Sequence, residues 1–376
     1  MKLGVSSLRI CTLGIIIINT AIITLLMSGN SYAQCEIGAF VGNNDHVMPT
    51  NSEIQNYESL TGRNLASTLV YWSWDDGVFP AQELYANGYN KQNILHFTWE
   101  PWARQGAYDP NYTLSDINNG IFDSYITQFA QDCRDWQSPI RLRFGHEMIQ
   151  DNNPITPGWY PWQDKPAEYV QAWNRVYNIF ETQGAINVEF VWAPNHHSTN
   201  VNELMAYYPG ADKVDWLGMD GYNWGTYTAQ EPWGYWLEFE EVFGSLYDTL
   251  TTNDQIFGDK KLMIAEFASA EVSAIEGKTK AEWIANAFNK IQNDYSEIEA
   301  FYWFNALKER DWRVNSGTGE TLAAFQLAMT NSYFTEYTVP EPSSIILFSS
   351  GLLGLMFNIS FSNFKKTIKM KGGYKT

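Results

Sequence analysis

Residues 139–147 read Pro-Ile-Arg-Leu-Arg-Phe-Gly-His-Glu, a short apolar-rich segment that ends in a glycine, a histidine and a carboxylate. A second segment of this kind, Leu-Met-Ile-Ala at 262–265, is followed at once by Glu266. Near-continuous apolar runs of this length are typical of parallel strands that are covered on both faces. Each segment therefore predicts a buried strand whose last residues carry chemistry.

Similar runs recur through residues 36–335, with no Pro/Gly/Ser linker, low-complexity tract or charge run to divide them. They lie at 37–41, 65–72, 93–99, 140–144, 188–192, 214–219, 261–267 and 298–304. The segments between them have helical spacing of apolar residues, as at 167–182 and 280–292. Eight strands alternating with helices in about 300 residues predict a single α/β domain, a (β/α)8 TIM barrel. An open doubly wound sheet is the alternative, but no glycine-rich phosphate loop supports it.

In such barrels the reacting groups stand at the carboxyl ends of the strands. Glu147 follows the fourth predicted strand and Glu266 the seventh, so the two carboxylates face each other across the barrel mouth. Glycoside cleavage needs such a pair, because one carboxyl group protonates the leaving oxygen while the other attacks the anomeric carbon. In a retaining enzyme the two groups lie ~5–5.5 Å apart.

Six short motifs at these strand ends form a specific combination. They are Thr98-Trp99-Glu100-Pro101-Trp102, Arg143-Phe144-Gly145-His146-Glu147-Met148, Trp159-Tyr160-Pro161-Trp162, Val191-Trp192-Ala193-Pro194-Asn195, Trp216-Leu217-Gly218-Met219-Asp220-Gly221-Tyr222-Asn223-Trp224 and Ala265-Glu266-Phe267. The set resembles glycoside hydrolase family 26 over about residues 36–335. The resemblance implies that Glu147 is the general acid/base and Glu266 the nucleophile of a retaining endo-β-glycosidase.

The same resemblance assigns further residues to substrate binding. It implies that His146 contacts the sugar, that Tyr222 hydrogen-bonds the nucleophile and that Trp303 forms the floor of the subsite. Indole rings offer flat apolar surfaces to the C–H faces of sugars, and polar groups at strand ends can bind hydroxyls. The remaining expected substrate-binding residues are Trp99, Glu100, Trp102, Trp159, Trp162, Trp192, Asn195, Asp220 and Trp224.

The substrate is less well defined than the reaction. Residues 149–158 form an insertion between the acid/base motif and the Trp-Tyr-Pro-Trp block, where the family usually runs on directly. β-1,4-Mannan is the leading expectation, because mannanase is the commonest activity of the family. Mixed-linkage β-1,3/1,4-glucan and β-1,3-xylan are alternatives, and the motifs at 99–101 and 159–162 resemble the glucan-cleaving branch. A non-catalytic carbohydrate-binding barrel is a further alternative, although it would have little reason to keep two mutually repelling carboxylates.

Other hydrolytic chemistries fit less well. His146-Glu147 begins a zinc-protease motif, but the second histidine would fall at position 150, which is Gln150. His196 and His197 are adjacent, and neighbours on a strand point to opposite faces. No Gly-x-Ser-x-Gly elbow of a serine hydrolase is present. We therefore expect neither a metal nor another cofactor.

Charge indicates the class of partner. The net charge is −18, from 24 basic and 42 acidic residues. Seven of the bases lie in residues 1–33 and 343–376, which contain no acid, so the central body has 17 bases against 42 acids, or −25. Such a body repels nucleic acid and anionic lipid, and a neutral polysaccharide suits it better. We expect a monomer.

The amino-terminal segment resembles a secretory signal peptide. Residues 1–33 contain Lys2 and Arg9, then an apolar run, and close with Ser31-Tyr32-Ala33. A retained membrane anchor is the alternative. Cleavage after Ala33 would leave two cysteines, Cys35 and Cys133, as a plausible pair in an oxidising compartment. The sequence leaves that bond open.

The carboxyl-terminal segment combines three parts in a fixed order. Pro340-Glu341-Pro342 precedes 19 uncharged residues, 343–361, and a run of lysines follows. About this length is the minimum for spanning a bilayer, and the lysines would stay cytoplasmic. Residues 339–376 resemble a PEP-CTERM sorting signal, which implies recognition by an exosortase at the surface of a Gram-negative bacterium. An ordinary tail anchor is the alternative, and either interpretation places the body outside the cytoplasm.

Overall fold

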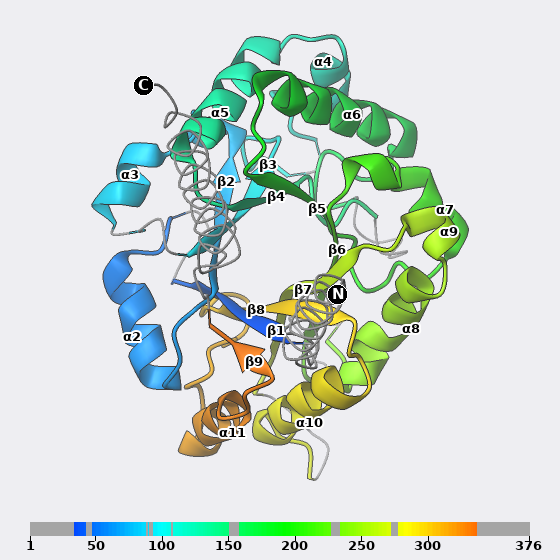
Figure 1. The fold of residues 1–376 in the computed structure, drawn as a ribbon. Coiled ribbons are helices and arrows are strands. Elements are labelled where there is room, and N and C mark those ends of the chain that lie inside the picture. Colours follow the sequence, from blue (N-terminus) through cyan, green and yellow to red (C-terminus); the bar gives the residue numbers. More distant parts are fainter. Residues whose placement is uncertain are drawn as a thin grey trace, which may run out of the picture. The chain divides into compact units, whose positions relative to one another are not determined.

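Eight parallel strands form a closed barrel in the computed structural model (Figure 1). They are β1 (Cys35–Val41), β2 (Ser67–Ser73), β3 (Ile94–Glu100), β4 (Ile140–Phe144), β5 (Val188–Trp192), β6 (Trp216–Asn223), β7 (Lys261–Ser269) and β8 (Ile298–Asn305). Consecutive strands pair with each other, and β1 closes the ring by pairing with both β8 and β2. The predicted TIM barrel is confirmed, with a strand at each of the eight predicted segments. A short additional strand, β9 (Phe334–Thr335), pairs with the start of β1 and was not predicted.

The structure describes residues 34–42, 47–87, 89, 93–106, 108–149, 158–226, 234–271 and 277–336. These residues belong to one unit, Met1–Tyr337, while the second unit, Thr338–Thr376, lies outside the described part. The expected signal peptide at 1–33 and the uncharged segment at 343–361 also lie outside it. Within the described ranges, no helix has the length and apolar character needed to cross a membrane.

Helices surround the barrel on its outer side (Figure 1). They are α2 (Asn51–Thr61), α3 (Ala81–Ala86), α4 (Leu114–Asn118), α5 (Asp123–Trp136), α6 (Pro166–Gln183), α7 (Val201–Tyr207), α8 (Phe239–Thr251), α9 (Asp254–Phe257), α10 (Lys280–Asn293) and α11 (Gly319–Met329), with short 3₁₀ turns at Trp74–Asp76 and Ala211–Lys213. The helices predicted at 167–182 and 280–292 correspond to α6 and α10. Local sequence sets their ends, because Pro166 begins α6, Gly184 ends it at φ 69°, and a capping box formed by Thr279 and Glu282 begins α10.

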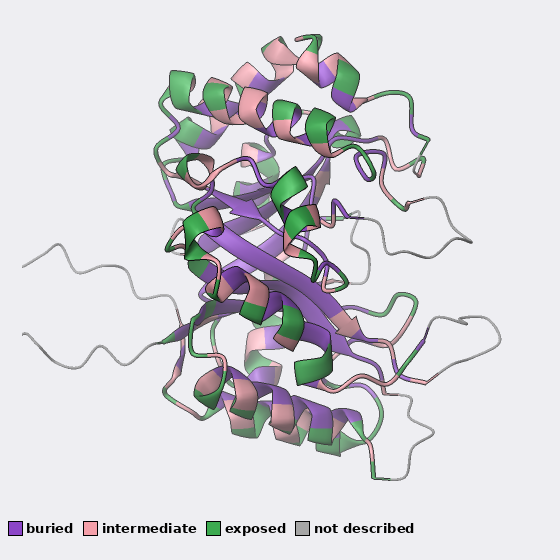
Figure 2. Ribbon diagram, turned by 90° about the vertical axis from the view of Figure 1, so that its right-hand side faces the viewer, coloured by how far each residue is buried: buried purple, intermediate pink, exposed green. Residues whose placement is uncertain are grey.

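Alternation along the strands separates two packed layers. Figure 2 shows buried strands covered by helices whose inner faces are buried and whose outer faces are exposed. On β3, the rings of Phe97 and Trp99 point outward and lie 5.6 and 4.3 Å from that of Phe129 on α5. His96, which precedes Phe97 and so has the opposite parity, points inward, with its ring 4.1 Å from that of Tyr302 on β8. Residues of one parity therefore fill the barrel, and residues of the other hold the helices.

Three tryptophans expected in substrate binding lie in the outer layer. Trp99, Trp192 and Trp303 are fully buried. The Trp192 indole donates to the carbonyl of Tyr207 on α7, and Trp303 packs 5.5 Å from Phe325 on α11. An indole enclosed between strand and helix cannot stack on a sugar ring. These three positions are core residues, and the substrate-binding expectation was wrong for them because it ignored strand parity.

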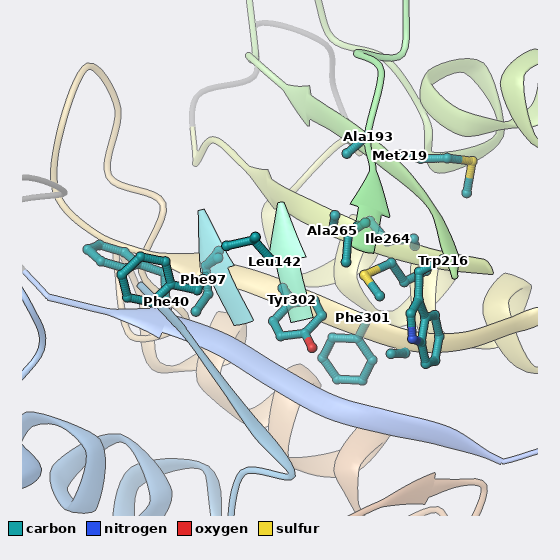
Figure 3. Packing of buried hydrophobic residues seen from close by; sticks show 14 of the residues in the cluster. Phe40, Phe97, Leu142, Ala193, Trp216, Met219, Ile264, Ala265, Phe301 and Tyr302 are labelled. Carbon is teal, nitrogen blue, oxygen red and sulfur yellow. The ribbon is translucent and has the colours of Figure 1, made fainter. Parts of the chain in front are cut away.

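A layer of small residues lies inside the barrel, where β5, β6 and β7 approach each other. Figure 3 shows Ala193 and Ala265 among the packed side chains of the strands. A Cβ added at Gly218 would lie 2.7 Å from the Cβ of Ala193 and 3.1 Å from that of Ala265. Only glycine fits between these two alanines, so Ala265 points into the barrel.

The two cysteines whose pairing the sequence left open are not bonded to each other. Cys35 on β1 and Cys133 on α5 are both free and buried. Helix α5 lies on the far side of the barrel from β1 (Figure 1). A disulfide requires Cα atoms within about 7 Å, which this arrangement does not provide.

Replacing Trp303 with alanine tests the corrected assignment. Loss of a buried indole should lower the free energy of unfolding by about 3–5 kcal/mol. The matched control is Trp159→Ala, at a side chain that is 67% exposed, which should change it by no more than about 0.5 kcal/mol. Urea unfolding followed by circular dichroism measures both. Equal losses in the two variants would contradict the placement of Trp303 in the core.

Candidate active site

Glu266, near the end of β7, is held by donors from three different strands. Tyr71 of β2 donates to Oε2 at 2.5 Å, and Arg143 of β4 donates to the same oxygen at 2.7 Å. Tyr222 of β6 donates to the other oxygen, Oε1. The side chain of Glu266 is only 10% exposed. Three donors complement its negative charge and fix both oxygens in place.

Arg143 is the buried cation of this site. Its Nη1 contacts both carboxylate oxygens of Asp220 at 2.8 Å, and its Nε donates to Thr98 Oγ1 at 2.9 Å. Burial opposes the charged form, but the carboxylates of Asp220 and Glu266 raise the pKa of Arg143 well above its usual value. The guanidinium is therefore a permanent cation that joins two carboxylates.

A β-bulge turns Glu266 toward the interior. Met219 of β6 pairs with Ile264 of β7, but the next residue, Asp220, pairs with Glu266, so Ala265 is an extra residue in β7. Ala265 and Glu266 consequently both point inward, which strict alternation would forbid. Bulges of this kind occur next to active sites, where they redirect a side chain. Without it, Glu266 would face the helices.

Glu147 stands on a strained turn just beyond β4. Gly145 and Glu147 have left-handed backbone conformations, with φ of 53° and 49°. For a residue other than glycine such a conformation costs about 1–3 kcal/mol and persists only where its surroundings fix it. Here the amide of Glu147 donates to the carbonyl of Ala193 at 2.9 Å, and Gln163 donates to the carbonyl of Glu147 at 2.6 Å. These bonds hold the carboxylate side chain at the end of the barrel.

The pKa values of the two phenols beside Glu266 are both raised. Burial raises the pKa of Tyr222 well above its usual value, and the neighbouring carboxylate of Glu266 raises it further. Burial also raises the pKa of Tyr71, again with a contribution from Glu266. Both phenols therefore stay protonated and act as donors. Glu147 follows β4 and Glu266 lies near the end of β7, so both carboxylates lie at the carboxyl end of the barrel.

His146 contacts two aromatic residues, Tyr160 and Trp162. Its Nε2 lies 3.1 Å from the hydroxyl of Tyr160, and its carbonyl accepts from the Trp162 indole at 2.7 Å. The rings of Tyr160 and Trp162 are stacked at 4.4 Å. Burial, with Arg143 adding to it, lowers the pKa of His146 well below its usual value, so the ring is neutral. Contact between His146 and a sugar stays a prediction.

The other expected binding residues divide by exposure. Trp102 and Trp162 are buried, with rings 5.7 Å apart, so they support Tyr160 and offer no open face. Trp159 is exposed, and Trp224 is half-buried with its ring 5.1 Å from that of Trp312. Of the four indoles, Trp159 and Trp224 have the most solvent-accessible surface, and their contact with a substrate stays a prediction.

Glu100, Asn195 and Asp220 are buried at the strand ends. Asn195 forms a bridge with Asp220 and accepts from Ser198 at 3.1 Å, so it helps to hold the end of β6 in place. Asp220 is fully buried and pairs with Arg143, and its contact with a substrate stays a prediction. Residues 150–157, most of the insertion at 149–158, lie outside the described residues.

His196 and His197 do not point to opposite faces. Their ring centroids lie 3.8 Å apart, because both residues follow the end of β5, where strand alternation no longer applies. Burial lowers the pKa of His196 to about 3. Across the described residues, no three His, Cys, Asp or Glu side chains converge in a possible metal site.

Sequence reasoning missed Tyr71 and did not assign Arg143 to the site. Both residues lie within strands and point into the barrel. The sequence-based expectation was centred on residues at or just after the strand ends. His96 and Thr98 of β3 point into the barrel, and Thr98 is the register partner of Arg143 on β4. Strand alternation would therefore have placed Arg143 inside the barrel, beside Thr98.

Arg143→Met tests the central ion pair. Removing the guanidinium leaves two buried carboxylates unpaired, so the free energy of unfolding at pH 7 should fall by about 3–5 kcal/mol. The control is Arg175→Met, which breaks the surface pair with Asp123 and should cost less than about 1 kcal/mol.

The pH dependence of that variant is a second readout. Burial raises the pKa of Asp220 and Arg143 opposes that rise, so without Arg143 the folded state keeps Asp220 protonated, whereas the unfolded chain releases that proton. The folded state thus binds more protons, and the stability of the variant should fall as pH rises from about 4 to 7. Denaturant midpoints across this range measure the slope, and a loss no larger than that of the Arg175 variant would contradict the role of Arg143.

Comparison with sequence families adds two matches. The Glycosyl hydrolase family 26 model matches residues 77–301, and the PEP-CTERM protein-sorting motif matches residues 338–358. Endoglucanase H of Acetivibrio thermocellus is 37% identical over 313 residues, which cover 80% of this chain and 31% of that protein. A beta-1,3-xylanase of an Alcaligenes species is 21% identical over 218 residues, or 54% of this chain and 42% of the xylanase. The chain thus spans less than half the length of either relative.

Solved structures of low sequence identity share the fold. The catalytic domain of a GH26 endo-β-1,4-mannanase from Bacillus sp. JAMB-750 aligns with a TM-score of 0.60 at 16% identity, covering 82% of this chain and 89% of that domain. A Cellulomonas fimi endo-β-1,4-mannanase double mutant aligns with a TM-score of 0.56 at 16% identity, covering 81% of this chain and 72% of the mannanase chain. At this identity the likeness concerns the fold.

Proposed function

The chain belongs to glycosyl hydrolase family 26, and we propose that it is a retaining endo-β-glucanase. The observation that carries the reaction type is Glu266, which donors from three strands hold at the barrel end that also presents Glu147. The relative named Endoglucanase H, at 37% identity over most of this chain, favours glucan. The mannanases share only 16% identity with this chain, so mannan, the leading expectation from sequence alone, becomes an alternative that the same assay tests.

Glu266 is the proposed nucleophile. One of its oxygens attacks the anomeric carbon and forms an ester, while the bond to the leaving oxygen breaks and Glu147 supplies the proton to that oxygen. Glu147 then takes a proton from a water molecule whose oxygen attacks the anomeric carbon, and the bond from that carbon to Glu266 breaks, which frees the carboxylate and releases the sugar with its original configuration. Tyr71, Arg143 and Tyr222 orient the carboxylate before attack. This preorganisation needs no movement of these groups during the reaction.

Replacement of either glutamate should abolish most activity while the fold is kept. Glu147→Ala should lower kcat by about 10²–10⁴-fold, the usual contribution of general acid/base catalysis. Glu266→Ala should lower it by several orders of magnitude, and azide should restore turnover with formation of an inverted glycosyl azide. Reducing-end release measures both, with Glu181→Ala on the outer face of α6 as the control. Near-normal activity in either active-site variant would contradict the assignment.

A panel of polysaccharides tests the substrate. The purified protein should release reducing ends from β-1,4- or mixed-linkage β-1,3/1,4-glucan faster than from β-1,4-mannan, glucomannan or β-1,3-xylan. Viscosity that falls faster than reducing ends accumulate would indicate internal cleavage. Preference for mannan would overturn the glucan proposal and leave the glutamate roles intact. Inactivity on every member would favour a non-catalytic carbohydrate-binding barrel or a polysaccharide made by the producing cell.

The sorting motif at 338–358 supports export. We propose that residues 1–33 direct secretion, that residues 36–335 form the catalytic domain, and that an exosortase recognises residues 339–376 at the surface of a Gram-negative cell. The acidic central body, with its low affinity for anionic surfaces, suits a monomer that acts on a neutral polysaccharide outside the cell. Trimming of an exopolysaccharide made by the same cell fits this location as well as digestion of plant material.

A further inference from the structure

Lys280, the first residue of α10, is a lysine with no exposed surface. Its ammonium donates at 2.9 Å to three acceptors in the segment between β8 and α11: the carbonyls of Asp311 and Arg313 and the hydroxyl of Ser316. Fully buried lysines are rare, because removing an ammonium from water is costly. All three contacts join α10 to a single segment of chain.

The three N–H donors of the Lys280 ammonium match its three acceptors in this segment. An ammonium has three N–H donors and no acceptor, and a carbonyl can only accept. Burial lowers the pKa of Lys280 to about 7, against the opposing charges of Glu271 and Asp311. Ser316 in turn donates to Glu271 at 3.3 Å. The arrangement uses each proton of the charged form.

The two carbonyls that bind Lys280 belong to the residues on either side of Trp312. The amide of Trp312 donates to the carbonyl of Ala306 at 2.9 Å, and its carbonyl accepts from the Trp303 indole at 3.0 Å. The backbone at Trp312 is therefore fixed by α10, by β8 and by its own segment. Its side chain is 1% exposed.

The indole of Trp312 supports the active site. Its ring lies 4.9 Å from that of Tyr222 and 5.1 Å from that of Trp224. Tyr222 donates to Oε1 of Glu266. A continuous set of contacts thus runs from Lys280 through Trp312 and Tyr222 to the proposed nucleophile.

We propose that Lys280 is a positioning residue for the nucleophile: by holding the residues on both sides of Trp312, it keeps Tyr222 aligned with Glu266. This inference rests on the proposed role of Glu266. Lys280 itself lies outside the set of groups that touch substrate, and it acts through a buried aromatic contact.

The test compares Lys280→Met with Lys290→Met, a lysine on the same helix that forms a surface pair with Asp294. On the polysaccharide that the wild type hydrolyses, Lys280→Met should lower kcat by about tenfold with little change in KM, because small displacements at a reacting group are costly. Trp312→Phe should have a similar effect, and Lys290→Met should have none. A fall confined to KM, or no fall, would overturn the proposal.

A double-mutant cycle distinguishes positioning from general stability. If Lys280 acts through Tyr222, then Lys280→Met should have little further effect on kcat in a Tyr222→Phe background. Fully additive losses would overturn the proposal. Should Lys280→Met not fold, Ser316→Ala removes a single acceptor and takes its place in the same cycle.

A third readout does not depend on activity. Hydrogen exchange measured by mass spectrometry should be faster in residues 306–318 of Lys280→Met than in the wild type, and unchanged in Lys290→Met. Unchanged exchange in that segment would overturn the proposal even if the enzyme is active. Inactivity of the wild type on all polysaccharides would instead count against the proposed function, and the exchange result would still decide whether Lys280 holds the segment.

Discussion

The buried guanidinium of Arg143 is the interaction on which the site depends. It binds Asp220 and Glu266 through separate nitrogens and Thr98 through a third, so one side chain of β4 connects β3, β6 and β7 inside the barrel. Neither carboxylate could be buried as an anion without it, because an unpaired charge in the interior is strongly destabilising. Arg143 also lies on the strand that leads to Glu147, so the position of β4 governs both proposed catalytic groups.

Two local departures from regular structure position the carboxylates of Glu147 and Glu266 at this end of the barrel. Glu147 is carried by a left-handed turn that bonds to Ala193 and Gln163, and Glu266 by a bulge that inserts Ala265 into β7. A regular strand would place the proposed nucleophile against the helices. Each departure costs stability. The close packing of small residues and aromatic rings around the two sites limits that cost. The register between β7 and β8 also shifts near the start of both strands, between Leu262 and Met263, so the bulge at Ala265 is not the sole irregularity among the described strands.

Much of the fold could be predicted from sequence, because buried parallel strands leave uninterrupted apolar runs and the helices between them keep a helical period. The two glutamates could be found because they follow such runs directly. The binding residues were less predictable, since Trp99 and Trp303 occupy strand ends but have outward parity. Tyr71 escaped notice because it lies within its strand and acts from across the barrel. The bulge at Ala265 leaves no signal in composition or period, since an alanine next to a glutamate fits a regular strand equally well.

Asp220 has a consequence for the chemical cycle as a whole. In the proposed covalent intermediate Glu266 is an ester and carries no charge, so it no longer balances Arg143. Both oxygens of Asp220 still accept from Nη1 of Arg143 at 2.8 Å, so the buried cation keeps a counter-ion for the lifetime of the intermediate. The ester therefore has no unpaired positive charge beside it. When it is hydrolysed, the carboxylate of Glu266 forms again next to Arg143, which is already oriented to donate to it. Asp220 thus keeps the guanidinium of Arg143 paired in both half-reactions, while Glu266 alternates between carboxylate and ester.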